Sequence, residues 1–288
     1  MVNAGIRKKI RGILENGGIA SADFEAEQLL KWGLGEKYYM TGFSEEIDGE
    51  RERLLTEAAI RRTEGEPLQY ILGEWDFYGY TFKVGEGVLI PRQETELLVE
   101  KALPYINEDS AVIDLCSGSG CIPIAIAKKT GAKCVGVEIS REAINYFSEN
   151  IRLNGIEDKV RIAEGDVLSP EKSLLDSLPR ADLITANPPY LTGEEMRTLQ
   201  KEVRREPKIA LYGGSDGMDY YGKIFEEWLP MLKPRGIFAV EAGDGQSGAI
   251  REIMESKGLS CRVFKDYGGV ERVIVGEKGE PEIKGKGL

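Results

Sequence analysis

Four consecutive residues, Asn187-Pro188-Pro189-Tyr190, combine groups that could bind a planar amino group. Proline holds φ fixed and donates no backbone hydrogen bond, so two adjacent prolines predict a rigid loop. The Asn187 side chain and the Pro188 backbone each offer a carbonyl oxygen, and these two acceptors suit the two hydrogens of an NH2 group. Tyr190 adds an aromatic face for stacking. The competing interpretation is a structural Pro-Pro turn with a buried tyrosine.

A second candidate site is the glycine-rich stretch Asp114-Leu115-Cys116-Ser117-Gly118-Ser119-Gly120, which precedes an acidic residue, Glu138. Glycines let the backbone approach a cofactor and leave amides free at a helix start. At the tip of the next predicted strand, Glu138 is placed to bind both hydroxyls of a ribose. The dinucleotide fingerprint requires a third glycine where Pro123 stands, which disfavours an NAD-binding module. A tight turn with a surface glutamate is the structural alternative.

The composition excludes several kinds of chemistry. The 288 residues include no histidine, which excludes a Ser-His-Asp triad, a Cys-His pair and any His-ligated metal. The cysteines form no CxxC pair, which predicts reduced thiols and no zinc site. A net charge of −11 disfavours broad binding to nucleic acid phosphates. With neither a signal peptide nor an apolar span, the sequence predicts a cytoplasmic protein without membrane contact or metal.

The predicted elements place both motifs at the carboxyl ends of strands in one sheet. Strands and helices alternate, which predicts an α/β fold with a mostly parallel, doubly wound sheet. We expect parallel strands at 111–116, 134–139, 160–167, 181–186 and 236–242, and an antiparallel pair at 260–265 and 271–276. We also expect helices at 94–103, stopped by Pro104, and at 218–232, ended by Pro234. Such a seven-stranded sheet is typical of class I methyltransferases.

The sequence also predicts a division of the chain. Residues 1–75 read as a small helical domain, with Ser21 capping a helix that carries Phe24, and with Leu54 and Leu55 on one face of a third helix. Residues 76–91 suggest a β-hairpin linker. We expect the catalytic domain at 92–279 and a flexible polar tail at 280–288.

Further segments resemble the bacterial release factor glutamine methyltransferases, the HemK/PrmC family. The matching segments are 65–73, 89–96, 205–207, 213–217 and 266–273, in the family's order. The resemblance covers nearly the whole chain. It implies a Rossmann-like class I fold, a substrate-recognising N-terminal helical domain and S-adenosyl-L-methionine as cofactor. It also implies a protein partner, the class 1 peptide chain release factors, methylated on the glutamine of their Gly-Gly-Gln motif.

The resemblance implies roles for individual residues. The cofactor loop corresponds to Cys116, Ser117, Gly118, Ser119 and Gly120, the ribose-binding acid to Glu138, positions near the adenine to Asp166 and Val167, and the glutamine-binding motif to Asn187, Pro188, Pro189 and Tyr190. The family usually has glycine at Cys116, so we expect this residue to avoid conformations that only glycine tolerates. Val167 replaces a bulkier residue of some members, which weakens stacking on adenine. For Arg92 and Glu94, surface pairing and a site role both stay open.

An amide nitrogen is a poor nucleophile, so alignment with an electrophilic methyl group should matter more than a strong base. The main alternative is an adenine N6 methyltransferase acting on DNA or RNA, because a flipped base presents a similar planar amine. The net charge of −11 disfavours this alternative, and so does the resemblance of segments 65–73 and 89–96 to the linker of the glutamine methyltransferase family. A glutamine methyltransferase for a ribosomal protein is a second alternative, and residues 91–96 favour the release factor branch.

Overall fold

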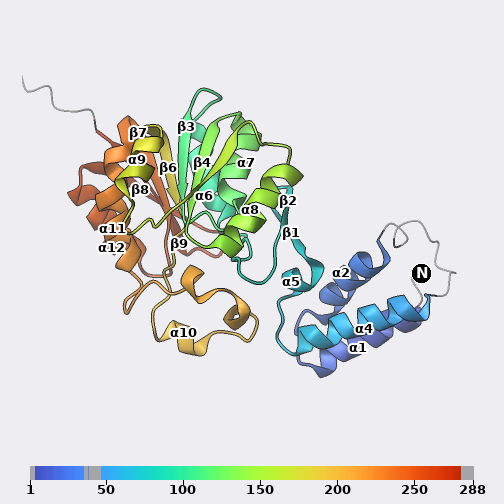
Figure 1. The fold of residues 1–288 in the computed structure, drawn as a ribbon. Coiled ribbons are helices and arrows are strands. Elements are labelled where there is room, and N and C mark those ends of the chain that lie inside the picture. The colour runs from blue at the N-terminus through green and yellow to red at the C-terminus, as the bar shows by residue number, and fades with distance from the viewer. Residues whose placement is uncertain (1–3, 36–37, 39–46, 280–288) are drawn as a thin grey trace, which may run out of the picture. The chain divides into compact units, whose positions relative to one another are not determined.

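The computed structural model describes residues 4–35, 38 and 47–279, so the predicted tail at 280–288 lies outside the described residues (Figure 1). The chain divides into two compact units. Unit 1 is Met1–Glu74 together with Gln200–Arg205, and unit 2 is Trp75–Leu199 together with Glu206–Leu288. The return of Gln200–Arg205 to unit 1 is a long-range attachment that local sequence patterns do not indicate.

Unit 1 is built from helices that share one apolar core. The helices are α1 (Ala4–Asn16), α2 (Ala22–Leu34), α4 (Gly49–Thr63) and α5 (Leu68–Leu72). Ser21 precedes α2 as predicted, but its hydroxyl donates to Glu25 instead of capping the helix. Leu55 is fully buried, whereas Phe24 is 52% exposed and Leu54 is 41% exposed. The predicted burial of Leu54 beside Leu55 is wrong, because neighbours on a helix point about 100° apart.

A buried ion pair fixes Gln200–Arg205 within unit 1. The Arg62 guanidinium donates to both Glu25 carboxylate oxygens, at 2.6 and 3.2 Å, and to Glu202 at 3.3 Å. The Arg62 and Glu25 side chains are only 8% and 7% exposed. Removing one partner of such a pair leaves an uncompensated buried charge. Arg62 therefore ties α4 to α2 and to the returning segment.

The remaining helices and strands follow in chain order. They are β1 (Glu74–Phe77), β2 (Tyr80–Lys83), α6 (Glu96–Ala102), β3 (Ala111–Leu115), α7 (Cys121–Thr130), β4 (Lys133–Glu138), α8 (Arg141–Leu153), β5 (Val160–Glu164), α9 (Lys172–Ser177), β6 (Ala181–Ala186), α10 (Glu195–Thr198), α11 (Asp219–Trp228), β7 (Leu232–Glu241), α12 (Ser247–Ser256), β8 (Leu259–Lys265) and β9 (Glu271–Lys278). Short 3-10 turns lie at Leu103–Tyr105, Val203–Arg205, Lys208–Ala210 and Leu229–Met231.

Within the described residues, seven strands form one sheet in the order β5-β4-β3-β6-β7-β9-β8. The strands from β3 to β7 run parallel, and β9 is antiparallel to both β7 and β8. This confirms the predicted class I architecture. The strand order reverses at β3, which lies between β4 and β6. In open α/β sheets, ligands bind beyond the carboxyl ends of the strands at such a point.

Helices cover both faces of the sheet (Figure 1). Alternate strand residues point to opposite faces, so Val112 packs with the side chains of α6, α7 and α8. Its neighbour Ile113 packs with α11 and α12. Burial on both faces explains why these strands read as continuous apolar runs.

Three boundaries differ from the predictions because of local backbone geometry. The helix α11 ends at Trp228, and Pro234 lies inside β7, where the register with β6 is irregular. A bulge tolerates the missing amide of a proline. Pro104 continues α6 as a 3-10 turn instead of stopping it. The hairpin linker has strands only over β1 and β2, joined at Tyr78 and Gly79, which both have positive φ.

Candidate active site

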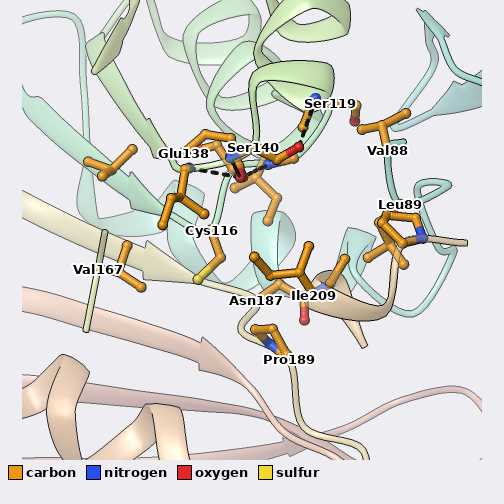
Figure 2. Close-up of a pocket in the computed structure, with 18 of the residues that line it drawn as sticks. Val88, Leu89, Cys116, Ser119, Glu138, Ser140, Val167, Asn187, Pro189 and Ile209 are labelled. Carbon is orange, nitrogen blue, oxygen red and sulfur yellow. Dashed lines mark hydrogen bonds between the residues drawn. The ribbon is translucent and has the colours of Figure 1, made fainter. Parts of the chain in front are cut away.

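A pocket in unit 2 lies at the carboxyl ends of β3, β4 and β6 (Figure 2). The predicted site residues that line it are Cys116, Ser117, Gly118, Ser119, Glu138, Asp166, Val167, Asn187 and Pro189. The other three predicted residues, Gly120, Pro188 and Tyr190, are not part of the lining. The two motifs that the sequence singled out therefore meet at one pocket, although Asn187 follows Cys116 by a long stretch of chain.

The loop after β3 turns sharply through residues with left-handed backbone. Cys116 has φ +57° and Gly118 has φ +53°. The expectation that Cys116 avoids such a conformation is therefore wrong. A left-handed L-residue costs roughly 1–2 kcal/mol, which the packed surroundings must offset. Burial raises the pKa of the Cys116 thiol well above its ordinary value, so the sulfur stays protonated and is not a nucleophile.

Gly120 has a packing role behind the loop. A Cβ atom added to it would lie 2.0 Å from the Phe147 ring, and one added to Gly136 would lie 2.3 Å from the same ring. Phe147 is fully buried on α8. The two glycines therefore allow α8 to pack closely against the cofactor loop and β4.

Glu138 ends β4 and accepts three backbone hydrogen bonds. Its Oε2 accepts from the Gly118 amide at 2.8 Å, and its Oε1 accepts from the Ile139 and Ser140 amides at 2.9 and 2.8 Å. The dashed lines at Glu138 in Figure 2 mark bonds of this cluster. A carboxylate has about four acceptor positions. Glu138 therefore fixes the loop and keeps acceptor capacity that faces the pocket.

The wall beyond β5 is mainly apolar. Asp166 accepts from the Leu168 amide at 2.8 Å, which shapes the turn after the strand. Val167 is buried, and its carbonyl accepts from the Trp228 indole at 2.9 Å. Tyr220, at the start of α11, also lines this pocket. Burial raises the pKa of Tyr220 to about 12, so its hydroxyl remains neutral.

The Asn-Pro-Pro-Tyr motif follows β6, and Asn187 is its half-buried polar residue in the pocket. The Asn187 Nδ2 donates to the Thr95 hydroxyl oxygen at 3.1 Å. The Tyr190 carbonyl accepts from Gln246 at 2.9 Å. A Cβ atom on Gly213 would lie 2.5 Å from the Pro189 oxygen. Residues 213–217 thus pack directly on the motif, which gives that matched segment a structural reason.

Two buried acids lie at the same edge of the sheet. Asp114 is fully buried and accepts from the Thr185 hydroxyl at 2.6 Å, while Glu241 is 1% exposed. Burial raises the pKa of each to about 7. One oxygen of each carboxyl, Asp114 Oδ2 and Glu241 Oε2, has no hydrogen-bond partner among the described residues. Sequence reasoning missed Glu241, although an acid at a strand's carboxyl end was the criterion that selected Glu138.

Arg92 pairs with a buried acid at the pocket wall. Arg92 lines the pocket and forms an ion pair with Glu206, whose side chain is only 2% exposed. Glu206 also accepts from the Ile90 amide at 3.0 Å. This is a partly buried pair that holds the segment after Glu206 against the pocket. Glu94 is exposed and outside the pocket lining.

Several lining residues were not predicted, among them Thr95, Leu89 and Ile209. Thr95 and Leu89 lie within the linker segment that carries the family resemblance, so the motif itself could have suggested them. Ile209 is 51% exposed on a loop far along the chain. No local pattern links that loop to the cofactor loop.

Known proteins resemble this chain in sequence and in fold. Residues 6–73 match the family model of the PrmC N-terminal domain, and residues 91–214 match that of the TRM5/TYW2 methyltransferase domain. A methyltransferase structure from Pyrococcus furiosus superposes with a TM-score of 0.53 at 19% identity, covering 69% of this chain and 88% of that one. This likeness shows the fold alone.

No helix among the described residues has the length and apolarity needed to cross a membrane. Within the same residues, no group of three or more histidine, cysteine, aspartate or glutamate side chains could hold a metal ion.

Curated relatives identify the family. The release factor glutamine methyltransferase of Geobacter sulfurreducens is 39% identical over 93% of this chain and 94% of its own length. The protein of that name from Thermodesulfovibrio yellowstonii is 40% identical over 81% of this chain and 84% of its own. These matches confirm the resemblance that the motifs indicated. The chain belongs to the release factor glutamine methyltransferase family.

Proposed function

We propose that this protein transfers the methyl group of S-adenosylmethionine to the side-chain amide nitrogen, N5, of a glutamine in a release factor. The observation that carries the proposal is the position of Asn187 in a pocket shared with the glycine loop and Glu138. Because the Asn187 Nδ2 is engaged by Thr95, the Oδ1 atom is the group left to meet a substrate. A carbonyl acceptor suits an amide NH2 group.

The pocket residues fit the cofactor by their chemistry. Glu138 offers a carboxylate acceptor for ribose hydroxyls, and Val167 with Ile139 offers apolar surface for the adenine. The loop formed by residues 116–119 brings backbone close to the bound molecule. S-adenosylmethionine supplies an electrophilic methyl group on a sulfonium, so the protein need not activate the methyl donor.

The protein's own contribution is orientation of the amide nitrogen. Asn187 Oδ1 and the Pro188 carbonyl accept the two amide hydrogens and aim the nitrogen at the methyl group. The Pro188 carbonyl is available because none of the described residues donates a hydrogen bond to it. Both carbonyl dipoles offset the positive charge that develops on the nitrogen. Tyr190 follows in the same rigid loop and stacks against the substrate amide. No strong base is required, and the absence of histidine from the chain agrees with this.

The substrate is a class 1 peptide chain release factor, modified at the glutamine of its Gly-Gly-Gln motif in the cytoplasm. Unit 1 recognises the body of that partner. Its helices carry exposed apolar side chains, Phe24, Leu54 and Ile60, while all the pocket-lining residues belong to unit 2. Substituting Phe24 and Ile60 by serine should raise KM for the whole factor and leave methylation of a short Gly-Gly-Gln peptide unchanged.

The decisive experiment incubates the protein with labelled S-adenosylmethionine and a purified class 1 release factor, and then maps the modified residue by mass spectrometry. Label on the Gly-Gly-Gln glutamine is the expected result. A factor with that glutamine replaced by alanine is the matched control and should take no label. Parallel reactions contain DNA and RNA. Label in adenine, or on another residue of the factor, would contradict the proposal.

A further inference from the structure

From the pocket wall, a polar chain leads from Asn187 into the protein interior. The Asn187 Nδ2 donates to Thr95 Oγ1 at 3.1 Å, and Thr95 is 2% exposed just before α6. Behind it lies the buried Glu241 carboxyl, near enough for the Thr95 hydroxyl to lower the pKa of Glu241 against the larger effect of burial. The Tyr190 hydroxyl reaches Glu241 Oε1 at 3.5 Å, the outer limit of a hydrogen bond.

Which of these groups donates and which accepts depends on the hydrogens that each one carries. A carboxyl oxygen that carries no proton only accepts, whether or not the other oxygen is protonated, and a threonine hydroxyl has one hydrogen to donate and two lone pairs to accept with. With the Thr95 hydrogen directed to Glu241, only the lone pairs of its oxygen remain for Asn187. These lone pairs can pair with the asparagine NH2 end and not with its carbonyl end.

We propose that Thr95, backed by Glu241, is a positioning residue that fixes the Asn187 side-chain amide with its oxygen toward the pocket. This inference rests on the proposed role of Asn187 as an acceptor for the substrate amide. Without the Thr95 hydroxyl, the asparagine amide can turn by 180° and present its NH2 group to the pocket. That orientation sets a donor against the donor hydrogens of the substrate. Thr95 touches neither reacting atom, so its effect passes entirely through Asn187.

The test uses Thr95→Val, which keeps the shape of the side chain and removes the hydroxyl. Loss of one orienting hydrogen bond should lower kcat roughly tenfold, with cofactor Kd and Tm close to the wild-type values. Thr95→Ser keeps the hydroxyl and should restore kcat to within about threefold of wild type. Thr95→Ala repeats the deletion with a smaller group if the valine variant does not fold. Thr81→Val, which removes a hydroxyl from β2 outside the pocket, is the matched control.

A double-mutant cycle with Asn187→Ala separates positioning from general structural support. If Thr95 acts only through Asn187, adding Thr95→Val to Asn187→Ala should change kcat by less than about twofold. Losses that multiply would overturn the inference, as would full activity of both Thr95→Val and Thr95→Ala. Those results would leave the proposed function intact, provided the wild-type protein still labels the Gly-Gly-Gln glutamine. Absence of that label would instead contradict the proposed function itself.

Discussion

The substitution Glu138→Gln tests how the pocket holds its cofactor. Glu138 receives three backbone amides, two on Oε1 and one, from Gly118, on Oε2. Glutamine has a single oxygen, so that oxygen can keep the pair from Ile139 and Ser140. Its NH2 group then faces the Gly118 amide, and two donors oppose each other. The change also removes the negative charge available to the ribose hydroxyls.

The expected size follows from those bonds. A hydrogen bond to a charged group contributes about 1.5–3 kcal/mol, so losing the acceptor for one ribose hydroxyl should weaken S-adenosylmethionine binding about 10–100-fold. The Gly118 bond exists without any ligand, so the Tm of the ligand-free protein should fall as well. Calorimetric titration measures the first effect and thermal melting measures the second.

The control is Glu164→Gln, because Glu164 pairs with Glu138 in register on β5 and its side chain is 55% exposed. It should change neither quantity. The informative contrary outcome is a lower Tm with cofactor affinity within about twofold of wild type. That result would show that Glu138 only holds the loop and contacts no cofactor.

Three further predictions concern the substrate motif, pH and unit 1. Asn187→Asp should lower turnover about 100-fold if neutral dipoles orient the amide, whereas retained turnover with a new acid limb in the pH profile would indicate a general base. Burial raises the pKa of Glu241 from 4.5 to about 7, so the folded protein favours the protonated carboxyl. The stability that the protonated Glu241 contributes is therefore complete below pH 4.5 and is lost as the pH rises through 7. Between pH 5 and 8.5, Glu241→Gln should therefore gain about 2–3 kcal/mol of stability relative to wild type, and a constant difference in urea unfolding would refute this. Arg62→Ala leaves Glu25 buried and unpaired, so it should destabilise unit 1 by about 3–5 kcal/mol in the same assay, unlike the exposed Arg53→Ala.

The fold was predictable because its strongest patterns are local and repeated. Apolar strands buried on both faces alternate with helices, and this periodicity depends on neighbours within each element. The errors occurred where tertiary packing overrides the local pattern. Pro234 reads as a helix terminator, yet the irregular pairing of β7 with β6 accommodates it inside a strand. Leu54 reads as a core residue, yet Leu55 occupies the buried face of α4.

The site was predictable only in part, for a related reason. Glu138 and Asn187 stand at the ends of predicted strands, and parallel strands bring such residues to one edge. Thr95, just before α6, bonds to Asn187, and Glu241, at the end of β7, bonds to Tyr190, and no spacing rule encodes these side-chain contacts. The backbone of Cys116 was mispredicted because its left-handed turn follows from loop closure and not from residue preference.

These departures from local preference share a location. The fully buried Asp114 and Glu241 carboxyls each leave one oxygen without a partner among the described residues; Glu241 ends β7, and Asp114 lies just before the end of β3. Cys116, with its strained backbone, begins the cofactor loop directly after β3. An apolar residue at either acidic position would fit a buried strand end better. The free-energy costs of buried, unpartnered carboxyl oxygens and of a strained backbone persist where a fold must hold polar groups in fixed directions. The Thr95 hydroxyl, which accepts from Asn187, meets that description, because we propose that it fixes the direction of this amide at the place where a substrate amide is aligned.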